Sequence, residues 1–208
     1  MKYEELKKFT GSRYPEPFVM DGYLQATDGK ALVRTPVTNT LLALAGPNFG
    51  KRTPSIDKCL WAEHDDVQWM DLPTIDLETL EPCDECHGTL TVPGMKACPE
   101  CDGEGEVCLE NDHNEYECMC KTCDGEGEVP SRVHVTDCTS CDSTGKDIGQ
   151  ENPVQIGEAH IQIRYVLRMA RLAGARVGQV SQWHDPVPFV FDSGSGFVMP
   201  VRMGLWGL

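Results

Sequence analysis

The sequence is poor in basic residues. Its 208 residues include 18 Lys and Arg against 33 Asp and Glu, which gives a formal net charge of −15. Binding to nucleic-acid phosphates needs concentrated Lys and Arg, so this balance argues against a chain that binds polyanions over its whole length. No apolar run approaches the roughly 18 residues of a membrane span, and no apolar segment with basic flanks follows Met1. We therefore expect no membrane span, no secretory signal and a cytoplasmic protein.

Motifs of common catalytic sites are also missing. The chain has no glycine-rich phosphate loop, no nucleophile elbow, no HExxH helix and no pair of carboxylates in an acid–base setting. Two compact polar clusters, His64-Asp65-Asp66 and His184-Asp185, are interpreted as turns or surface segments. The sequence therefore predicts a protein that is not an enzyme.

What the chain does have, acidic residues and cysteines, is concentrated in one segment. Residues 81–150 carry a net charge of −13, whereas residues 1–80 carry −3 and residues 151–208 carry +1. Ten of the eleven cysteines also lie in this segment, and only Cys59 lies outside it. In a reducing compartment such cysteines hold metal more often than they form disulfides. We therefore expect a metal-binding module at 81–150, inserted between the two parts, 1–80 and 151–208, of a nearly neutral domain.

The module contains four CxxC pairs, each followed by glycine. Both thiolates of a CxxC pair can approach one ion, and eight thiolates are the number that two tetrahedral Zn²⁺ ions require. Closed four-cysteine sites have no open position for water, so both sites are interpreted as structural. Thiol–disulfide exchange at a CxxC pair is the alternative. The pairs are Cys83/Cys86, Cys98/Cys101, Cys120/Cys123 and Cys138/Cys141.

These repeats resemble the cysteine-rich domain of the DnaJ family, whose motif CxxCxGxG occurs four times. The resemblance implies that the first repeat shares a zinc ion with the fourth, and the second repeat with the third. One Zn²⁺ would then be held by Cys83, Cys86, Cys138 and Cys141, and the other by Cys98, Cys101, Cys120 and Cys123. The outer repeats depart from the motif, because Leu90 and Ser143 stand where it has glycine.

Two further cysteines of the module, Cys108 and Cys118, lie on either side of the polar turn at 111–114. We interpret them as a cross-strand thiol pair near the tip of a hairpin. A redox-active pair, or Cys118 as an alternative metal ligand, is the other interpretation.

The flanking segments predict helices and strands in the order α-β-β, insertion, α-β-β-β. Before the module, helical spacing covers 3–9, a strand covers 18–26, and Asp28-Gly29 predicts a hairpin turn to a strand at 31–34. After it, an amphipathic helix is expected over 158–173, followed by strands at 176–183, 187–191 and 196–203. Arg164, Arg168 and Arg171 share one face of that helix.

Several flanking motifs resemble the bacterial sliding clamp, the β subunit of DNA polymerase III. The segments that carry this resemblance are Ala26–Leu32, Tyr165–Leu172, Val187–Phe191 and Val198–Met203. It implies an α+β fold in which a clamp-like domain, with helices on one antiparallel sheet, is interrupted by a small two-zinc β-hairpin module. A zinc module inside such a domain resembles phage proteins and implies a phage origin, with the host cytoplasm as location. The length allows one clamp-like domain, so a ring would need self-association.

The function expected from these features is that of a non-enzymatic, zinc-binding adaptor. It would act through protein contacts in DNA replication, recombination or host takeover, and the acidic module favours a partner with a basic surface. The apolar residues Leu205, Trp206 and Leu208 are candidates for docking in a partner. In clamps the helices meet DNA, so Arg164, Arg168 and Arg171 are candidate DNA contacts. The alternative is a DnaJ-like module that binds unfolded proteins without a J domain, since the chain has no His-Pro-Asp tripeptide.

Overall fold

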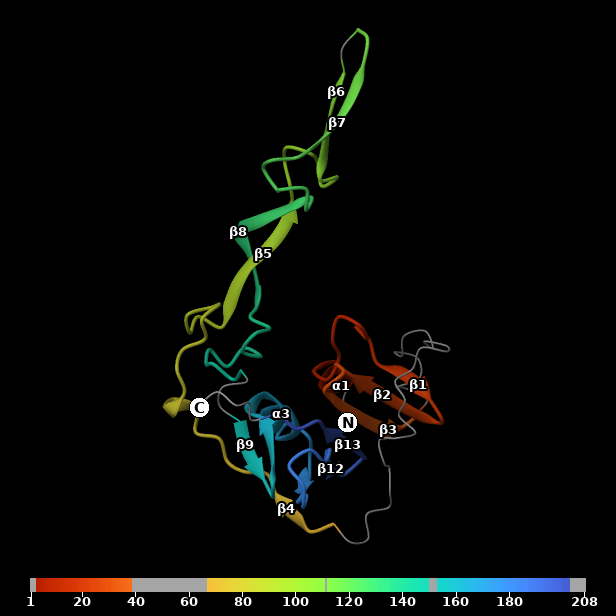
Figure 1. Cartoon of the computed structure of the whole chain (residues 1–208), viewed down its shortest axis with the longest axis vertical. Coiled ribbons are helices and arrows are strands. Elements are labelled where there is room, and N and C mark those ends of the chain that lie inside the picture. Colours follow the sequence, from red (N-terminus) through yellow and green to blue (C-terminus); the bar gives the residue numbers. More distant parts are fainter. Residues whose placement is uncertain (1–2, 39–66, 111, 150–152, 203–208) are drawn as a thin grey trace. The chain divides into compact units, whose positions relative to one another are not determined.

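The computed structural model describes residues 3–38, 67–110, 112–149 and 153–202 (Figure 1). The chain divides into two compact units. One unit combines Met1–Leu77 with Ile148–Leu208, and the other is Glu78–Asp147, which we call the module. Across the described ranges, no helix combines the length and the apolar character needed to cross a membrane.

The first unit is built around an antiparallel sheet of seven strands in the order β1-β2-β3-β13-β12-β11-β4. Strands from before and after the module therefore pair directly, because β3 lies beside β13, and β11 lies beside β4. The strands are β1 Phe18–Met20, β2 Tyr23–Thr27, β3 Ala31–Pro36, β4 Trp69–Asp71, β11 Arg176–Gly178, β12 Val187–Phe191 and β13 Gly194–Val198.

Two Asp-Gly turns shape the start of this sheet. Asp28-Gly29 joins β2 to β3 as expected, and the Asp28 carboxylate accepts hydrogen bonds from the backbone N–H groups of Lys30 and Ala31. The expected single strand at 18–26 is wrong, because Asp21-Gly22 forms a second turn, with φ of 51° and 78°, between β1 and β2. Positive φ at both central residues is the geometry that suits a tight hairpin.

The helix expected over 158–173 is much shorter in the structure. Residues Ala159–Gln162 form strand β10, which pairs with β9 (Pro153–Ile156) through a turn at Gly157. Helix α3 then covers Ile163–Met169. Side chains at 159–163 fit both an amphipathic helix and a half-buried strand, and pairing with β9 decides in favour of the strand. Of the three strands expected afterwards, β12 has the expected bounds and β11 ends earlier, whereas β13 begins two residues earlier and ends five residues earlier than expected.

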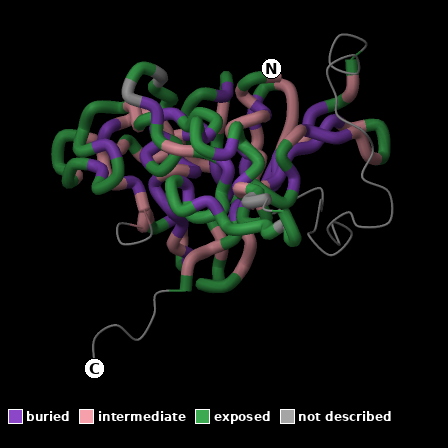
Figure 2. The backbone as a smooth tube through the Cα atoms, turned by 90° about the horizontal axis from the view of Figure 1, so that it is seen from above, coloured by how far each residue is buried: buried purple, intermediate pink, exposed green. Residues whose placement is uncertain are grey.

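The core of this unit lies between the sheet, α3 and the N-terminal helix α1 (Tyr3–Lys7). Figure 2 shows segments of buried residues in the interior, with segments of exposed residues around them. Leu6 and Phe9, the apolar pair expected on the first helix, are both fully buried, although α1 ends before Phe9. The Phe9 ring stacks on Phe189 of β12 at 6.1 Å.

The expected α+β fold class is wrong. Strands make up 39% of the structure and helices 9%, and the described residues contain only the two short α-helices α1 and α3. The chain is therefore mostly β, with several antiparallel sheets, and not a clamp-like domain with helices on one sheet. A helix of seven residues covers too little of a seven-stranded sheet to form a helical layer.

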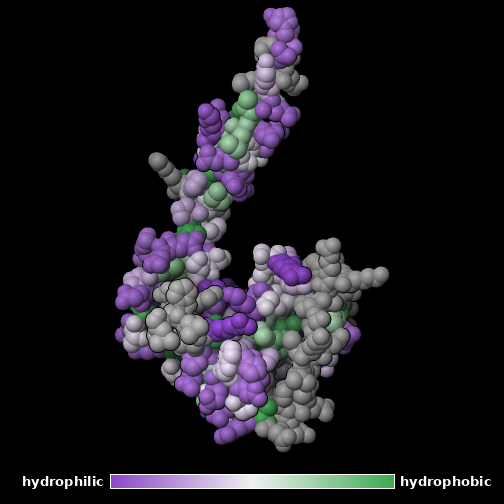
Figure 3. Space-filling model, viewed as in Figure 1, coloured by the Kyte–Doolittle hydropathy of each residue, from purple (hydrophilic) through white to green (hydrophobic). Residues whose placement is uncertain are grey.

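The module consists of two antiparallel ladders that follow a single-turn 3₁₀ helix, η2 (Leu77–Thr79). Strand β5 (Thr91–Ala97) pairs with β8 (Glu128–Asp137), and β6 (Glu106–Glu110) pairs with β7 (Glu115–Met119). The β5–β8 ladder contains a bulge in which residues 131–134 stand opposite Gly94 alone. Figure 3 shows apolar patches among the hydrophilic surface of this unit.

Candidate metal centres

Eight cysteines of the module gather in two buried groups of four. The outer group is Cys83, Cys86, Cys138 and Cys141, and the inner group is Cys98, Cys101, Cys120 and Cys123. Within each group all sulfur atoms lie within 4.8 Å of one another. The structure thus brings together the first repeat with the fourth and the second with the third.

The spacing of the sulfurs suits a tetrahedral metal ion. Sulfur distances between paired repeats are 3.9 and 3.7 Å in the outer group and 3.8 and 3.7 Å in the inner group. A tetrahedral ion with metal–sulfur bonds of about 2.3 Å places its ligands about 3.8 Å apart. Each group can therefore bind one metal ion, with two ions per chain.

Backbone hydrogen bonds hold the paired repeats together with approximate two-fold symmetry. In the inner group the N–H of Cys98 donates to the carbonyl of Gly127, and the N–H of Cys120 donates to the carbonyl of Gly105, both at 2.8 Å. In the outer group Cys83 N–H donates in the same way to Gly145, at 2.9 Å. Each repeat thus fixes the first cysteine of its partner, so the two halves of a site form together.

Backbone N–H groups also point at the sulfurs. Gly105 donates to Cys101 Sγ at 3.2 Å, Gly127 to Cys123 Sγ at 3.3 Å, and Gly145 to Cys141 Sγ at 3.4 Å. The turns that aim these groups need positive φ, which glycine adopts without strain. Such bonds stabilise thiolates and are the usual surroundings of ligating sulfur.

The thiols of each group differ in acidity. Burial raises the pKa of Cys101, but hydrogen bonds from the Gly105 and Gly103 N–H groups and from neighbouring thiols outweigh it and lower the pKa to about 7. Burial raises the pKa of Cys123, with the neighbouring thiols adding to the effect, to about 11. In the outer group the pKa of Cys86 is likewise lowered to about 7, and that of Cys138 is raised to about 12. Without a metal ion, the closely packed thiols of a group therefore oppose one another's ionisation. A divalent cation bound among them would neutralise the charge of the thiolates.

The outer group departs from the inner one on one of its two symmetric sides. Leu90 and Ser143 occupy positions that are glycine in the inner repeats, and both still have positive φ, of 70° and 59°. On the same side the Glu85 carboxylate lies 3.9 Å from Cys138 Sγ and accepts a hydrogen bond from Ser140 Oγ. The outer site thus keeps the backbone fold of the motif with two residues in a conformation that favours glycine.

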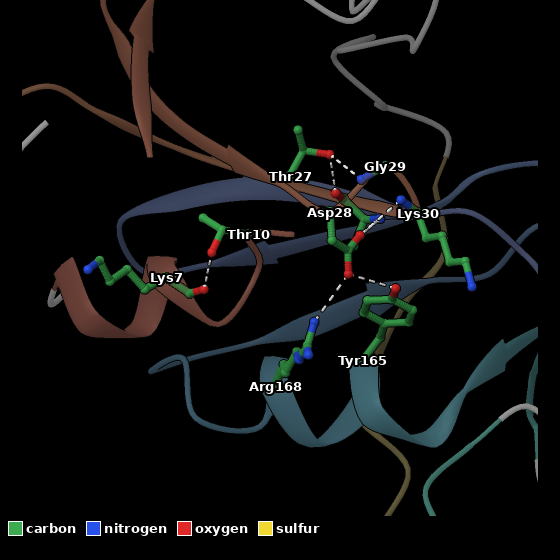
Figure 4. A network of polar contacts seen from close by, with 9 residues as sticks. Lys7, Thr10, Thr27, Asp28, Gly29, Lys30, Tyr165 and Arg168 are labelled. Carbon is green, nitrogen blue, oxygen red and sulfur yellow. Dashed lines mark hydrogen bonds and ion pairs between the residues drawn. The ribbon is translucent and has the colours of Figure 1, made fainter. Parts of the chain in front are cut away.

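The three arginines predicted as DNA contacts do not form one open face. Arg168 is buried and makes an ion pair with Asp28 at 3.2 Å, and Tyr165 donates a hydrogen bond to the same carboxylate oxygen at 2.8 Å (Figure 4). Arg164 is half-buried on α3, and Arg171 is exposed beyond the end of that helix. The periodicity that aligned them does not reveal that one is buried.

Cys108 and Cys118 lie on the β6–β7 hairpin but are not brought together. Cys108 stands opposite Glu117, and Cys118 stands opposite Val107. Because neighbouring residues of a strand point to opposite faces, the two exposed thiols lie on different faces of the ribbon. The other sequence candidates, Leu205, Trp206 and Leu208, lie outside the described residues, as do Cys59 and His64-Asp65-Asp66.

One feature of the module is missing from the sequence-based candidates: the exposed apolar residues on β5 and β8, above all Met95, Val133 and Val135. The alternating Val133-His134-Val135 was its only signal in the sequence.

Comparison with known protein families, characterised proteins and solved structures finds no match to this chain. Two buried four-cysteine centres in an acidic β module are therefore what characterises it.

Proposed function

We propose that both centres hold Zn²⁺ and that the zinc is structural. The observation that carries this proposal is the pair of buried groups, each with four sulfurs at tetrahedral spacing. Four thiolates complete the coordination of zinc and leave no position for water or substrate. What zinc supplies there is a fixed cross-link between repeats that lie up to 55 residues apart in the chain.

Iron is the other metal that suits four thiolates in a tetrahedron. Elemental analysis of the purified chain distinguishes the two, and only iron would give charge-transfer colour. We expect two zinc ions per chain, colourless, with the eight ligand thiols protected from alkylation until a chelator is added. Iron in place of zinc, or fewer than two bound ions, would contradict the proposal.

We further propose that the module acts by binding another protein rather than by catalysis. Its core consists largely of the metal ligands themselves, so its surface is left for contacts. Residues 81–150 carry a net charge of −13, and four bound thiolates make each zinc centre more negative still. Such a surface favours a basic partner and disfavours nucleic acid.

Capture of a partner by the zinc-loaded chain tests this role. Binding should weaken as salt is raised and should be lost in a Cys98→Ser/Cys120→Ser variant, which cannot complete the inner centre. The Cys108→Ser variant is the matched control, because that exposed thiol is outside both groups. A partner that binds the centre-deficient variant equally well would contradict a role for the module.

A second candidate is binding of unfolded chains, as the resemblance to the DnaJ family implies. It is favoured by large apolar side chains that are exposed on the module. Those exposed by half or more are Met95, Tyr116, Met119, Val133 and Val135. Suppression of the aggregation of a denatured test protein, by the zinc-loaded chain and not by the chelated one, would support it.

A further inference from the structure

The β5–β8 ladder has two different faces. Val92 on β5 packs against the outer cysteines and Val129 on β8 against the inner ones, so this face belongs to the metal centres. Residues at alternating positions of a strand share a face, so Pro93 and Met95 point the other way, together with their partners Val135 and Pro130. We call these four residues the apolar face.

The apolar face is open to solvent. Met95 is 51% exposed and Val135 is 59% exposed, and both prolines are exposed as well. Val133, in the bulge opposite Gly94, is 95% exposed. Apolar side chains gathered on one face of a small, otherwise polar unit indicate a contact surface.

Carboxylates lie at both ends of the apolar face. In the register of the ladder, Asp137 pairs with Thr91 at one end and Glu128 pairs with Ala97 at the other, on the same side as Met95. Seven strand residues span about 20 Å, which sets the separation of these two acidic ends. The face therefore offers apolar contact in the middle and negative charge on either side.

Two other occupants fit this surface less well. A second copy of the chain would place acidic ends against acidic ends, in modules whose residues 81–150 each carry −13. Pairing of a partner strand with an open edge of the ladder is opposed by Pro93 on β5 and Pro130 on β8, because proline removes a backbone donor. The remaining mode of binding is contact between a partner protein and the side chains of the apolar face.

We propose that this face binds an extended segment of a partner protein that has apolar side chains in its middle and Lys or Arg at both ends. The inference rests on the proposed protein-binding function and specifies its surface and the chemistry of its partner. Apolar side chains of the segment cover Met95 and Val135, and its basic ends pair with Glu128 and Asp137. Apolar burial supplies affinity, while the charges set direction and specificity.

Fluorescence anisotropy with a labelled peptide of about nine residues tests this, since that length covers the ladder. The peptide has alternating leucine and serine in the middle and two lysines at each end. Its counterparts carry glutamine or glutamate in place of lysine. We expect the zinc-loaded full chain to bind the lysine peptide saturably and more weakly at high salt, and to bind the glutamate peptide least.

Three double variants locate the binding. Met95→Ser/Val135→Ser should weaken it about tenfold, since two apolar contacts are lost. Tyr116→Ser/Met119→Ser, equally exposed on the β6–β7 hairpin, is the matched control and should bind as the natural chain does. Glu128→Gln/Asp137→Asn should weaken binding of the lysine peptide and remove most of its salt dependence.

The inference is overturned if the lysine peptide does not bind, or if both serine variants weaken binding alike. Equal binding of the glutamine peptide would overturn the basic partner and favour recognition of unfolded chains. Zinc is counted in every sample. A chain with two zinc ions that fails to bind the peptide contradicts this surface alone, whereas a chain without zinc contradicts the proposed metal centres.

Discussion

The carbonyl of Leu90 accepts a hydrogen bond from the N–H of Cys138 at 2.9 Å, as the carbonyl of Gly105 does from Cys120 at 2.8 Å. The fold of the repeat is therefore kept where its sequence departs from the motif. On the symmetric side of the outer group, Gly88 and Gly145 remain glycine. The two departures, Leu90 and Ser143, thus fall on one symmetric half of one centre, and leave the other half intact.

Substitution Ser143→Gly should strengthen the outer centre. A residue other than glycine at φ of 59° costs about 1 kcal/mol, and its removal should raise zinc affinity about fivefold. Titration with a competing chelator, monitored by native mass spectrometry, measures the change. Thr139→Gly in the same repeat is the control, since Thr139 is not among the residues with positive φ and gains nothing from glycine. An equal gain in both variants would contradict the explanation.

Substitution Gly105→Ala should disrupt the inner centre. A Cβ atom on Gly105 would overlap the carbonyl oxygen of Gly125, and backbone on both sides of the centre would have to move. We expect the variant to retain the outer zinc and to lose the inner one or bind it far more weakly. Gly88→Ala is the control, because its Cβ would lie 3.9 Å from the nearest atom while φ is similar. If both variants lose zinc equally, backbone strain and not close approach explains the motif.

Single cysteine substitutions should divide the cysteines into three classes by zinc content. Cys83→Ser should leave only the inner zinc, and Cys98→Ser only the outer one, because three thiolates and a hydroxyl bind zinc weakly. Cys118→Ser should retain two ions. Elemental analysis and native mass spectrometry give the counts. Loss of zinc from Cys118→Ser would identify Cys118 as a ligand, against the grouping in the structure.

The metal centres and the flanking sheet differ in how far the sequence could predict them. Each CxxC knuckle is a local structure whose ligands, turns and donors lie within about eight residues, so the repeats reveal it directly. The resemblance to the DnaJ family supplied the pairing of repeats, and spacing alone would not have done so. The helix expected at 158–173 is shortened because its first residues pair with β9 as strand β10. Hydrophobic periodicity carries no information about that pairing.

The arginines illustrate the same limit at the level of a single side chain. Three arginines spaced along a helix indicate a solvated or ligand-binding face, unless a partner from elsewhere buries one of them. Asp28, 140 residues away in the chain, is that partner for Arg168. The Asp28-Gly29 turn was recognised from local sequence, but the second role of its carboxylate needs the three-dimensional structure.

Substitution Arg168→Met should destabilise the sheet unit by about 3 kcal/mol, since it leaves the Asp28 carboxylate short of its ion-pair partner. All four tryptophans lie outside residues 78–147, so tryptophan fluorescence during urea unfolding follows this unit alone. The exposed Arg171→Met is the control and should change stability by less than about 0.5 kcal/mol. Equal effects of the two would contradict a structural role of the Asp28–Arg168 pair.

Substitution Tyr165→Phe should change how stability depends on pH. Burial, together with the charge of Asp28 and the hydrogen bond to it, raises the pKa of Tyr165 well above its usual range. A raised pKa means that the folded unit favours the neutral phenol, so this contribution is complete below the unfolded pKa of about 10 and is lost as pH rises above it. We expect the variant to be less stable by about 1.5 kcal/mol at neutral pH, because the hydrogen bond to Asp28 is lost. Between about pH 9 and pH 11 it should lose less stability than the natural chain does.

A second tyrosine of this unit, Tyr3, also has a raised pKa, of about 12, because of burial and its hydrogen bond to Glu16. Some loss of stability at alkaline pH should therefore remain in both proteins. Urea midpoints from tryptophan fluorescence measure both effects, with Tyr116→Phe in the module as control. An unchanged pH dependence in Tyr165→Phe would show that this phenol does not link alkaline pH to unfolding.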